Sequence, residues 1–214
     1  MRIVVHGQQA FGKAVLERLI KRNENIVAVC TAPDRQPDTI KVDPLKVNPL
    51  KEFAAQNGLA VHQPASWKTD ESLALMTSFD ADLCMMAYVL LFVPEAVLNA
   101  PKLGSFQYHP SLLPMHRGPS SINWPIAIVA TKTGLSIFWP NDGLDQGPVL
   151  LQKECEIGVG ETLGDIYFKK LFPMGVDAMI ESLDLVKLGQ APKLALDLSK
   201  GSYESWFGRS EANN

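Results

Sequence analysis

The sequence predicts an α/β protein with a doubly wound, mostly parallel open sheet of Rossmann-like type and helices on both faces. Strand-like apolar runs alternate with segments of helical spacing along most of the chain. Several of these runs are continuously apolar, which is typical of strands that are buried on both faces of a sheet. The 214 residues, 46% of them hydrophobic, are enough for a substantial core.

The chain begins with a strand–helix–strand unit, whose parallel crossover is almost always right-handed. Residues 3–6 form a β-branched run that ends at Gly7, residues 8–25 place apolar side chains at helical spacing, and residues 26–32 form a second apolar run. Residues 33–49 contain four prolines and no sustained period. They predict a long surface loop.

The middle of the chain continues the alternation up to residue 109. Composition and spacing predict a helix that ends near Gly58, a short strand, a helix, a fully buried strand, a short helix and another strand. The corresponding residues are 49–60, 61–64, 70–78, 81–90, 94–101 and 103–109.

The second half has more turns. The pattern predicts a helix, a strand, a turn cluster, a second strand, and one or two helices interrupted at Pro173. The corresponding residues are 118–130, 133–140, 141–148, 149–157 and 160–189. We expect one catalytic domain over residues 1–205. Residues 206–214 are expected to form a polar tail or the start of a linker to a missing domain.

Bulk charge and cysteine content narrow the function classes. The net charge is −3 and the basic residues are scattered, which argues against nucleic acid as a partner and favours a small ligand. The three cysteines match no metal spacing, so we expect buried inert thiols in a reducing compartment, with a catalytic thiol or a disulfide as the alternative. Without a signal region or a membrane-spanning run, a cytoplasmic protein with no membrane partner is expected.

Two polar residues are expected where strands end. Ligands of open α/β sheets bind beyond the carboxyl ends of the strands, where His109 and Asp145 are predicted to lie. An aspartate within about 3 Å of a histidine can hold its charge and orientation and take up a proton. Pro110 restricts His109 to extended geometry.

Other chemistries fit the sequence less well. His109 and His116 are seven positions apart, but no third and fourth ligands follow at suitable spacing, so no metal is expected. The segment "GQQAFG" is not a dinucleotide-binding fingerprint. No nucleophile elbow is present, which favours direct group transfer over a covalent enzyme intermediate. For Arg117, a structural or phosphate-facing role is favoured over a catalytic one.

The segments "HPSLLPMHRG" and "GLSIFWPNDGLDQGPVLLQKE" resemble the formyltetrahydrofolate-dependent formyltransferase and hydrolase superfamily. It includes methionyl-tRNA formyltransferase, glycinamide ribonucleotide formyltransferase and sugar N-formyltransferases. The likeness is greatest to the N-terminal hydrolase domain of 10-formyltetrahydrofolate dehydrogenase, and extends from "MRIVVHGQ" to "SYESW".

The resemblance implies a catalytic set and a folate site. The family's Asn-x-His and LD-x-G residues correspond to Gln107, His109 and Asp145, and the glutamine departs from the family's asparagine. The resemblance places the folate between the loop after the buried strand and the LD-x-G turn. The implied folate-binding residues are Met86, Ala87, Tyr88, Val89, Leu91, Asn141, Asp142 and Gly143. 10-Formyltetrahydrofolate is the implied formyl donor or substrate, with no metal.

Three functions remain open at this point. The first is transfer of the formyl group to an amine, with an aminoacyl group on a carrier protein, as in a peptide-synthetase formylation domain, as one candidate acceptor. The second is hydrolysis of 10-formyltetrahydrofolate to formate and tetrahydrofolate. The third is a folate-binding module without turnover. The His109/Asp145 pair argues against the third. The overall likeness favours hydrolysis, but the carboxamide of Gln107 and the short chain leave room for transfer, which we favour.

Overall fold

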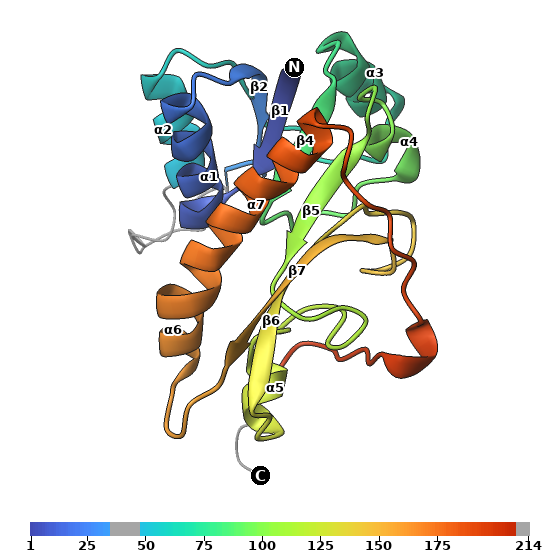
Figure 1. The fold of residues 1–214 in the computed structure, drawn as a ribbon. Coiled ribbons are helices and arrows are strands. Elements are labelled where there is room, and N and C mark those ends of the chain that lie inside the picture. The colour runs from blue at the N-terminus through green and yellow to red at the C-terminus, as the bar shows by residue number, and fades with distance from the viewer. Residues whose placement is uncertain (35–47, 209–214) are drawn as a thin grey trace. The chain divides into compact units, whose positions relative to one another are not determined.

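The computed structural model describes residues 1–34 and 48–208. The chain divides into two compact units, Met1–Gln107 and Tyr108–Asn214 (Figure 1). Residues 35–47 of the predicted surface loop and residues 209–214 of the predicted tail lie outside the described part.

The first unit is built on parallel strands. Its strands run in the spatial order β3-β2-β1-β4-β5, and each neighbouring pair is parallel. The strands are β1 (Arg2–Gly7), β2 (Asn25–Cys30), β3 (Val61–His62), β4 (Leu83–Ala87) and β5 (Ser105–His109). The last two residues of β5 already belong to the second unit. The carboxyl ends of these parallel strands meet at one edge of the sheet, where the sequence places the site.

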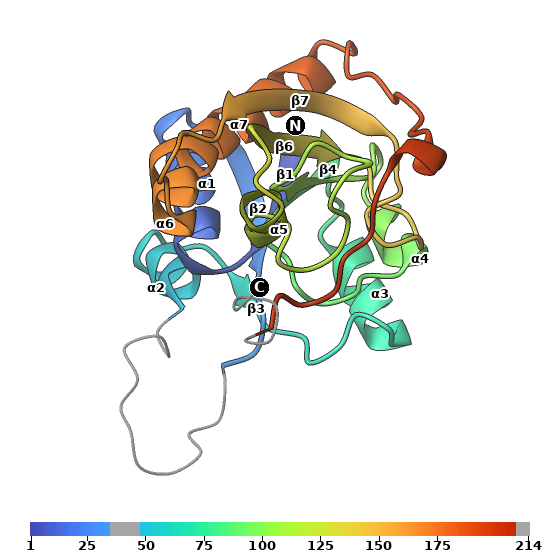
Figure 2. The same cartoon turned by 90° about the horizontal axis from the view of Figure 1, so that it is seen from below.

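Helices cover both faces of the first unit's sheet, as predicted. Figure 2 shows one helix pair on each side, and the α1 pair packs together. The pairs are α1 (Gln9–Lys21) with α2 (Pro49–Gln56), and α3 (Asp70–Ser78) with α4 (Glu95–Leu98). Strand side chains alternate between the faces, so Val4, Cys84 and Met86 join the core under α3 and α4.

Local signals explain where these elements begin and end. Helix α3 has its predicted bounds because Thr69 and Ser72 form a capping box at its start. Strand β4 is shorter than the predicted 81–90, since Tyr88 adopts a left-handed backbone with φ of 66°. A strand cannot continue through that conformation.

The second unit contains an antiparallel strand pair and a long helix. Strands β6 (Lys132–Phe138) and β7 (Val149–Glu156) pair antiparallel over most of their length, and α7 (Phe172–Lys187) packs on both. Helix α5 (Asn123–Ala127) is much shorter than the predicted 118–130. A 3₁₀ turn, Leu198–Lys200, precedes the last described segment.

The α-helical pattern is interrupted directly before Pro173, close to the predicted position, although the chain stays helical throughout. Helix α6 (Leu163–Ile166) continues through a π turn, Tyr167–Leu171, into α7, and Pro173 lies in the first turn of α7. Proline lacks an N–H and crowds the carbonyl group four residues earlier. The wider π turn directly before Pro173 accommodates both effects.

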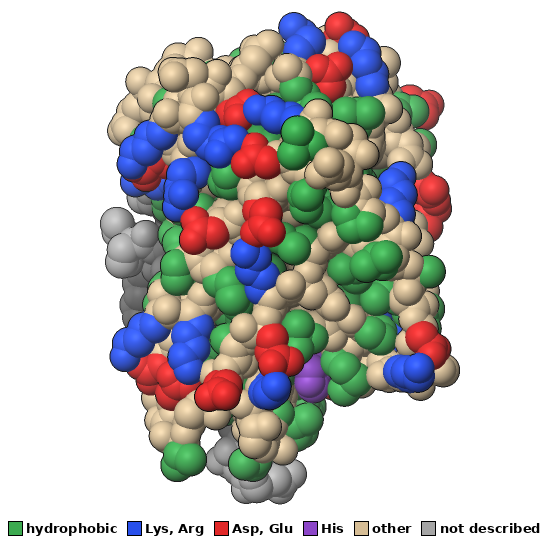
Figure 3. All heavy atoms as spheres, viewed as in Figure 1, with side chains coloured by type: hydrophobic (Ala, Val, Ile, Leu, Met, Phe, Trp, Pro, Cys, Tyr) green, Lys and Arg blue, Asp and Glu red, His purple; other side chains and the backbone are tan. Residues whose placement is uncertain are grey.

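No helix in the described residues has the length and apolar character needed to cross a membrane. Lysine, arginine and acidic side chains are interspersed on the face drawn in Figure 3. That face therefore offers no surface of a single charge sign that would suit a polyanion.

Candidate active site

His109 is the last residue of β5 and is almost fully buried, with 6% of its surface exposed. Pro110 follows it and favours the extended backbone that His109 has in the strand. The chain then turns at once, because the Ser111 N–H donates to the His109 carbonyl oxygen at 2.9 Å. The histidine therefore stands at a strand end on a stiff backbone, as the sequence predicts.

The loop after His109 is held by side chains from β6 and β7. The Ser136 hydroxyl donates to the Ser111 carbonyl oxygen at 2.7 Å and accepts from the Leu113 N–H at 3.0 Å. The Gln152 amide donates to the Leu113 carbonyl oxygen at 2.8 Å. Leu113 itself is buried against Phe138 and Val149. The backbone and the apolar side chain of Leu113 thus hold this loop in place.

The two nitrogens of the His109 ring face different partners. Nε2 lies 3.0 Å from the carbonyl oxygen of His116, which can only accept a hydrogen bond. Nδ1 lies 3.7 Å from Oδ2 of Asp145, longer than a hydrogen bond and within the range of an ion pair. The edge of the ring meets Phe138, with ring centroids 6.5 Å apart. Nδ1 is therefore the nitrogen left to serve a substrate.

Asp145 is presented by the loop between β6 and β7. It is 9% exposed, and its backbone is left-handed with φ of 51°, a conformation that aspartate adopts more readily than most residues. The Gly118 N–H donates to Oδ2 at 2.8 Å. Nearer the start of the loop, the Asn141 side chain accepts from the Gly143 N–H at 3.0 Å. Asp145 is thus aimed by its own backbone and by one peptide of the His109 loop.

This arrangement suits reactions at a carbonyl group. A buried carboxylate stabilises positive charge on a neighbouring imidazole, and a positioned ring N–H can stabilise an oxygen on which negative charge develops. The same carboxylate can take up a proton released by an attacking amine or water. Gln107 lies two residues before His109 on β5, and side chains at this spacing point to the same face of a strand.

The predicted folate-binding segments lie in different units. In the first unit, Met86 and Ala87 end β4, and the next residues expose apolar surface at Leu90, Leu91 and Phe92. An exposed apolar loop of this kind fits a flat aromatic ring. In the second unit, Asn141–Gly143 form the turn described above, with Asp142 exposed.

The remaining histidines have partners of other kinds. His6 is buried against Trp67, with ring centroids 4.8 Å apart, and burial lowers its pKa to about 3. The His62 ring contacts Phe79. His116 Nδ1 lies 3.0 Å from Glu204 Oε1. Within residues 1–34 and 48–208, no group of three or more histidine, cysteine or acidic side chains is arranged to hold a metal ion.

The cysteines match the prediction of inert thiols at two positions of three. Cys30 and Cys84 are buried free thiols, and burial raises the pKa of Cys84 to about 12 and that of Cys30 well above its usual range. Cys155 is free but only partly buried, and desolvation again raises its pKa. A raised pKa disfavours the reactive thiolate.

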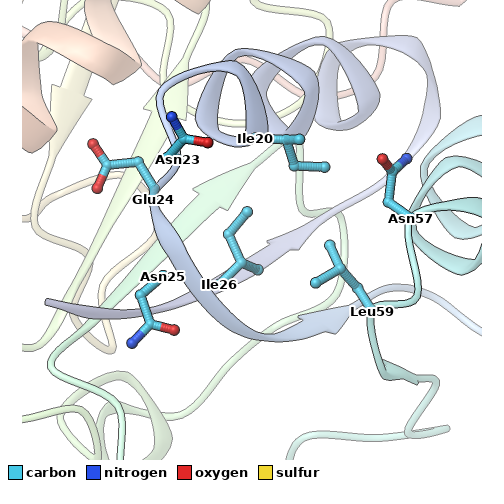
Figure 4. Close-up of a pocket in the computed structure, with 7 residues that line it drawn as sticks. All are labelled: Ile20, Asn23, Glu24, Asn25, Ile26, Asn57 and Leu59. Carbon is cyan, nitrogen blue, oxygen red and sulfur yellow. The ribbon is translucent and has the colours of Figure 1, made fainter.

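One surface depression in the first unit has a different character. It has a volume of about 390 Å³ and is lined by three asparagines, Glu24 and apolar side chains that Figure 4 labels. It includes the start of β2, at Asn25 and Ile26, and so lies at the amino end of a parallel strand. Ligands of such sheets bind at the opposite end.

Comparison with known proteins identifies the family of this chain. The sequence matches the family model described as formyl transferase over residues 1–183.

The chain belongs to this formyl transferase family.

Relatives of known name agree with this membership. The chain is 36% identical over 209 residues to mitochondrial 10-formyltetrahydrofolate dehydrogenase of Mus musculus, covering 95% of this chain and 22% of that protein. It is 37% identical over 191 residues to methionyl-tRNA formyltransferase of Flavobacterium psychrophilum, covering 88% of this chain and 59% of that protein. The chain thus spans about a fifth of the dehydrogenase's length.

Solved structures confirm the predicted fold. Glycinamide ribonucleotide transformylase 1 from Symbiobacterium toebii superposes with a TM-score of 0.73 at 20% identity, covering 92% of this chain and 93% of that chain. The sugar 3N-formyltransferase WlaRD, studied in the presence of dTDP and 5-N-formyl-THF, has a TM-score of 0.71 at 17% identity, covering 96% and 69%. At these identities the likeness shows the fold. The resemblance to the formyl transferase family inferred from the sequence is also confirmed.

The sequence did not indicate the residues near the C-terminus that bind the loop after His109. They belong to residues 201–207, which we call the strap. Within it, the side chains of Ser202 and Glu204 form hydrogen bonds with His116. The sequence near them, "GSYESWF", contains no motif that indicates a contact with the loop after His109. The only available signal was the continuation of the family likeness to "SYESW".

Proposed function

We propose that this member of the formyl transferase family is an N-formyltransferase that moves a formyl group from 10-formyltetrahydrofolate to an amine. The observation that carries the proposal is the buried pair formed by His109, at the end of β5, and Asp145, in the loop between β6 and β7. A histidine and a carboxylate that are both largely removed from water, in a chain of this family, have the chemistry that acyl transfer requires.

In the proposed reaction, the folate supplies a formyl group whose oxygen gains negative charge as the amine attacks. His109 donates to that oxygen from Nδ1, because Nε2 is engaged by the His116 carbonyl group. The Gln107 amide supplies a second donor from the same face of β5. Asp145 stabilises the positive charge on the ring and accepts the proton that the amine releases, directly or through one water. The bond between the formyl carbon and N10 of the folate then breaks, and N10 takes up that proton, so that the products are the formylated amine and tetrahydrofolate.

The proposed folate site uses the segments that the family resemblance indicates. The apolar residues after β4 would cover the flat ring, and backbone groups of residues 86–91 and 141–143 would supply its hydrogen bonds. The exposed apolar side chains of Leu90, Leu91 and Phe92 support the first part of this assignment. The second part rests on the resemblance. An aminoacyl group on a carrier protein remains one candidate acceptor.

Hydrolysis is the second candidate, with water in place of the amine. The similarity to proteins named 10-formyltetrahydrofolate dehydrogenase, which covers 95% of this chain, favours it. The catalytic residues would keep the same roles, since water also loses a proton when it attacks the formyl carbon. The two reactions differ only in what occupies the acceptor position.

A single assay separates the two reactions. The protein is mixed with 10-formyltetrahydrofolate, with and without a panel of amines, and the release of tetrahydrofolate, formate and formylated amine is followed. Transfer predicts a formylated amine and release that depends on the amine. Formate release at the same rate without any amine would replace the proposal with hydrolysis.

Two variants test the residue assignment. His109→Ala is expected to abolish most of the turnover, whereas His62→Asn, which changes a histidine on β3, is expected to retain it. No tetrahydrofolate release under any condition, or full activity in His109→Ala, would contradict the proposed mechanism.

A further inference from the structure

The ring orientation of His109 depends on the peptide of His116. The His116 carbonyl oxygen accepts from His109 Nε2 at 3.0 Å, so Nε2 carries a proton and Nδ1 is left to face Asp145. If this carbonyl group rotated away, the neutral ring would be free to place its single proton on either nitrogen. The position of the His116 peptide therefore decides which nitrogen of the neutral His109 ring carries the proton.

That peptide has an uncommon backbone. His116 has φ of 54°, in the left-handed region that non-glycine residues seldom adopt. Such a conformation persists where the surrounding structure holds it. Here the holding contacts come from the strap. The His116 N–H donates to the Ser202 hydroxyl at 2.9 Å, and the Arg117 N–H donates to the Ser202 carbonyl oxygen at 3.1 Å.

The side chain of His116 is held by the same segment. Its Nδ1 lies 3.0 Å from Oε1 of Glu204, and both side chains are largely buried, with 9% and 20% exposed. The other carboxylate oxygen of Glu204 is buried and has no hydrogen-bond partner among the described residues. The contact with His116 is thus the one that compensates for burying this carboxylate. Glu204 thus fixes the side chain of His116, and Ser202 fixes its backbone.

The strap also reaches the second partner of His109. The Glu204 N–H donates to the Arg117 carbonyl oxygen at 3.2 Å. A side chain at Gly118 would approach the Glu204 carbonyl oxygen to 2.8 Å. Gly118 is the residue whose N–H donates to Asp145. Farther along, the Trp124 indole donates to the Ser205 carbonyl oxygen at 2.9 Å, which anchors the strap beyond Glu204.

We propose that Glu204 is a positioning residue for His109. By holding His116, it keeps the His116 carbonyl group on Nε2 of His109, so that Nε2 retains its proton and Nδ1, which faces Asp145, is the nitrogen that gains the proton it donates to the substrate. The expected effect of Glu204 on turnover rests on the proposed function, whereas its expected effect on the proton position in the His109 ring does not. The Glu204 side chain binds His116, and the His116 carbonyl group binds His109, so Glu204 acts on His109 through His116.

The ring of His109 gives a readout that is independent of turnover. Nitrogen-15 spectra of the imidazole groups distinguish Nε2–H from Nδ1–H forms. In the wild-type protein, the neutral ring of His109 is expected to be present as a single Nε2–H form. Glu204→Ala is expected to show a mixture of the two forms. Glu204→Gln keeps the size of the side chain and an accepting oxygen, so its spectrum is expected to lie between these two. It also serves if the alanine variant fails to fold.

The kinetic expectation follows from an indirect role. In metal sites, removing the partner that orients a ligating histidine typically lowers affinity or activity by about 10- to 100-fold, and we expect an effect of the same order for an orienting partner of His109. Glu204→Ala is expected to lower kcat by this factor and to leave the KM for 10-formyltetrahydrofolate within about twofold. In a His109→Ala background the same change is expected to have no further effect. Glu154→Ala, which removes a carboxylate paired with Lys132 on the surface, is the matched control and is expected to match the wild type.

The possible outcomes are distinct. A single Nε2–H form of His109 in both Glu204 variants would overturn the proposal. It would also be overturned if Glu204→Ala lowered activity by the same factor in the wild-type protein and in the His109→Ala variant. If the wild-type protein shows no turnover, the proposed function fails, yet the nitrogen spectra still decide whether Glu204 positions the ring.

Discussion

Asp145 combines two features at the residue scale: a negative charge 3.7 Å from His109 Nδ1, and an oxygen that accepts from the Gly118 N–H. Asp145→Asn separates them, because asparagine keeps the accepting oxygen and tolerates a left-handed backbone but has no charge. Loss of a general base is expected to lower kcat by about 10²- to 10⁴-fold, with little change in the melting temperature. Steady-state kinetics and thermal unfolding check this. An unchanged kcat would show that the charge of Asp145 is not used.

Gln107 is the residue at which this chain departs from the family resemblance. If its amide donates to the formyl oxygen, Gln107→Ala should lower kcat by about 10²- to 10³-fold, the usual cost of losing one such donor. Gln107→Asn restores the family's side chain and is expected to retain far more activity than Gln107→Ala. Comparing formylated amine with formate in each variant shows whether the donor matters equally for both reactions. Equal activity of the alanine variant and the wild type would remove Gln107 from the catalytic set.

At the scale of elements, the close contact between β6 and β7 depends on one glycine. A Cβ added at Gly134 would lie 2.2 Å from the Lys153 carbonyl oxygen and 2.6 Å from a methyl group of Leu112. Gly134→Ala therefore forces β7 or the His109 loop to shift, and is expected to destabilise the protein by about 2–3 kcal/mol. Gly164→Ala, in α6, meets no atom closer than 3.7 Å and is the matched control. It is expected to be neutral or stabilising by up to about 1 kcal/mol. Thermal unfolding of both variants checks this, and equal melting temperatures would contradict it.

For the molecule as a whole, one buried histidine is expected to shape how stability depends on pH. Burial lowers the pKa of His6 from 6.5 to about 3, so the folded protein keeps this ring neutral. Above pH 6.5 the ring is neutral in both folded and unfolded chains, and stability is unaffected. Below it, only the unfolded chain binds the proton, so the free energy of unfolding falls by about 1.4 kcal/mol per pH unit until the pH nears 3.

This pH effect is isolated by comparison with a variant that does not titrate. Between pH 7.5 and pH 5.0, the wild type should lose about 2 kcal/mol of unfolding free energy more than His6→Phe. Urea unfolding at the two pH values measures the difference. The same loss in both proteins would show that His6 does not stay neutral in the folded state.

Most elements of the first unit are predictable from sequence because their signals are local. Continuous apolar runs mark β1, β2 and β4, and the Thr69 cap marks the start of α3. The end of β4 was missed because a left-handed Tyr88 leaves no pattern in the sequence. Pro173 marks where the α-helical pattern is interrupted, but the sequence pattern does not indicate that the interruption takes the form of a π turn.

The site shows the same division between local and distant signals. His109 and Asp145 can be singled out because a proline, a turn cluster and two strand ends accompany them in sequence. Their functional roles stay a prediction. Glu204 could not be found, since its partner His116 is 88 positions away and a lone acidic residue in a polar segment has no pattern. Contacts that close such long loops are set by the folded chain as a whole.

The strap has a practical consequence for how this domain is cut out or joined to others. The family match ends at residue 183, and a boundary chosen between residues 183 and 200 would remove every strap residue. The truncated protein would keep His109, Asp145 and all seven strands but lose the segment that braces their loop. A fusion partner or affinity tag should therefore start beyond Phe207, whose N–H is bound to Ser120. If a protein that ends before the strap is inactive, the loss is expected to come from the missing strap and not from the chemistry of His109 and Asp145.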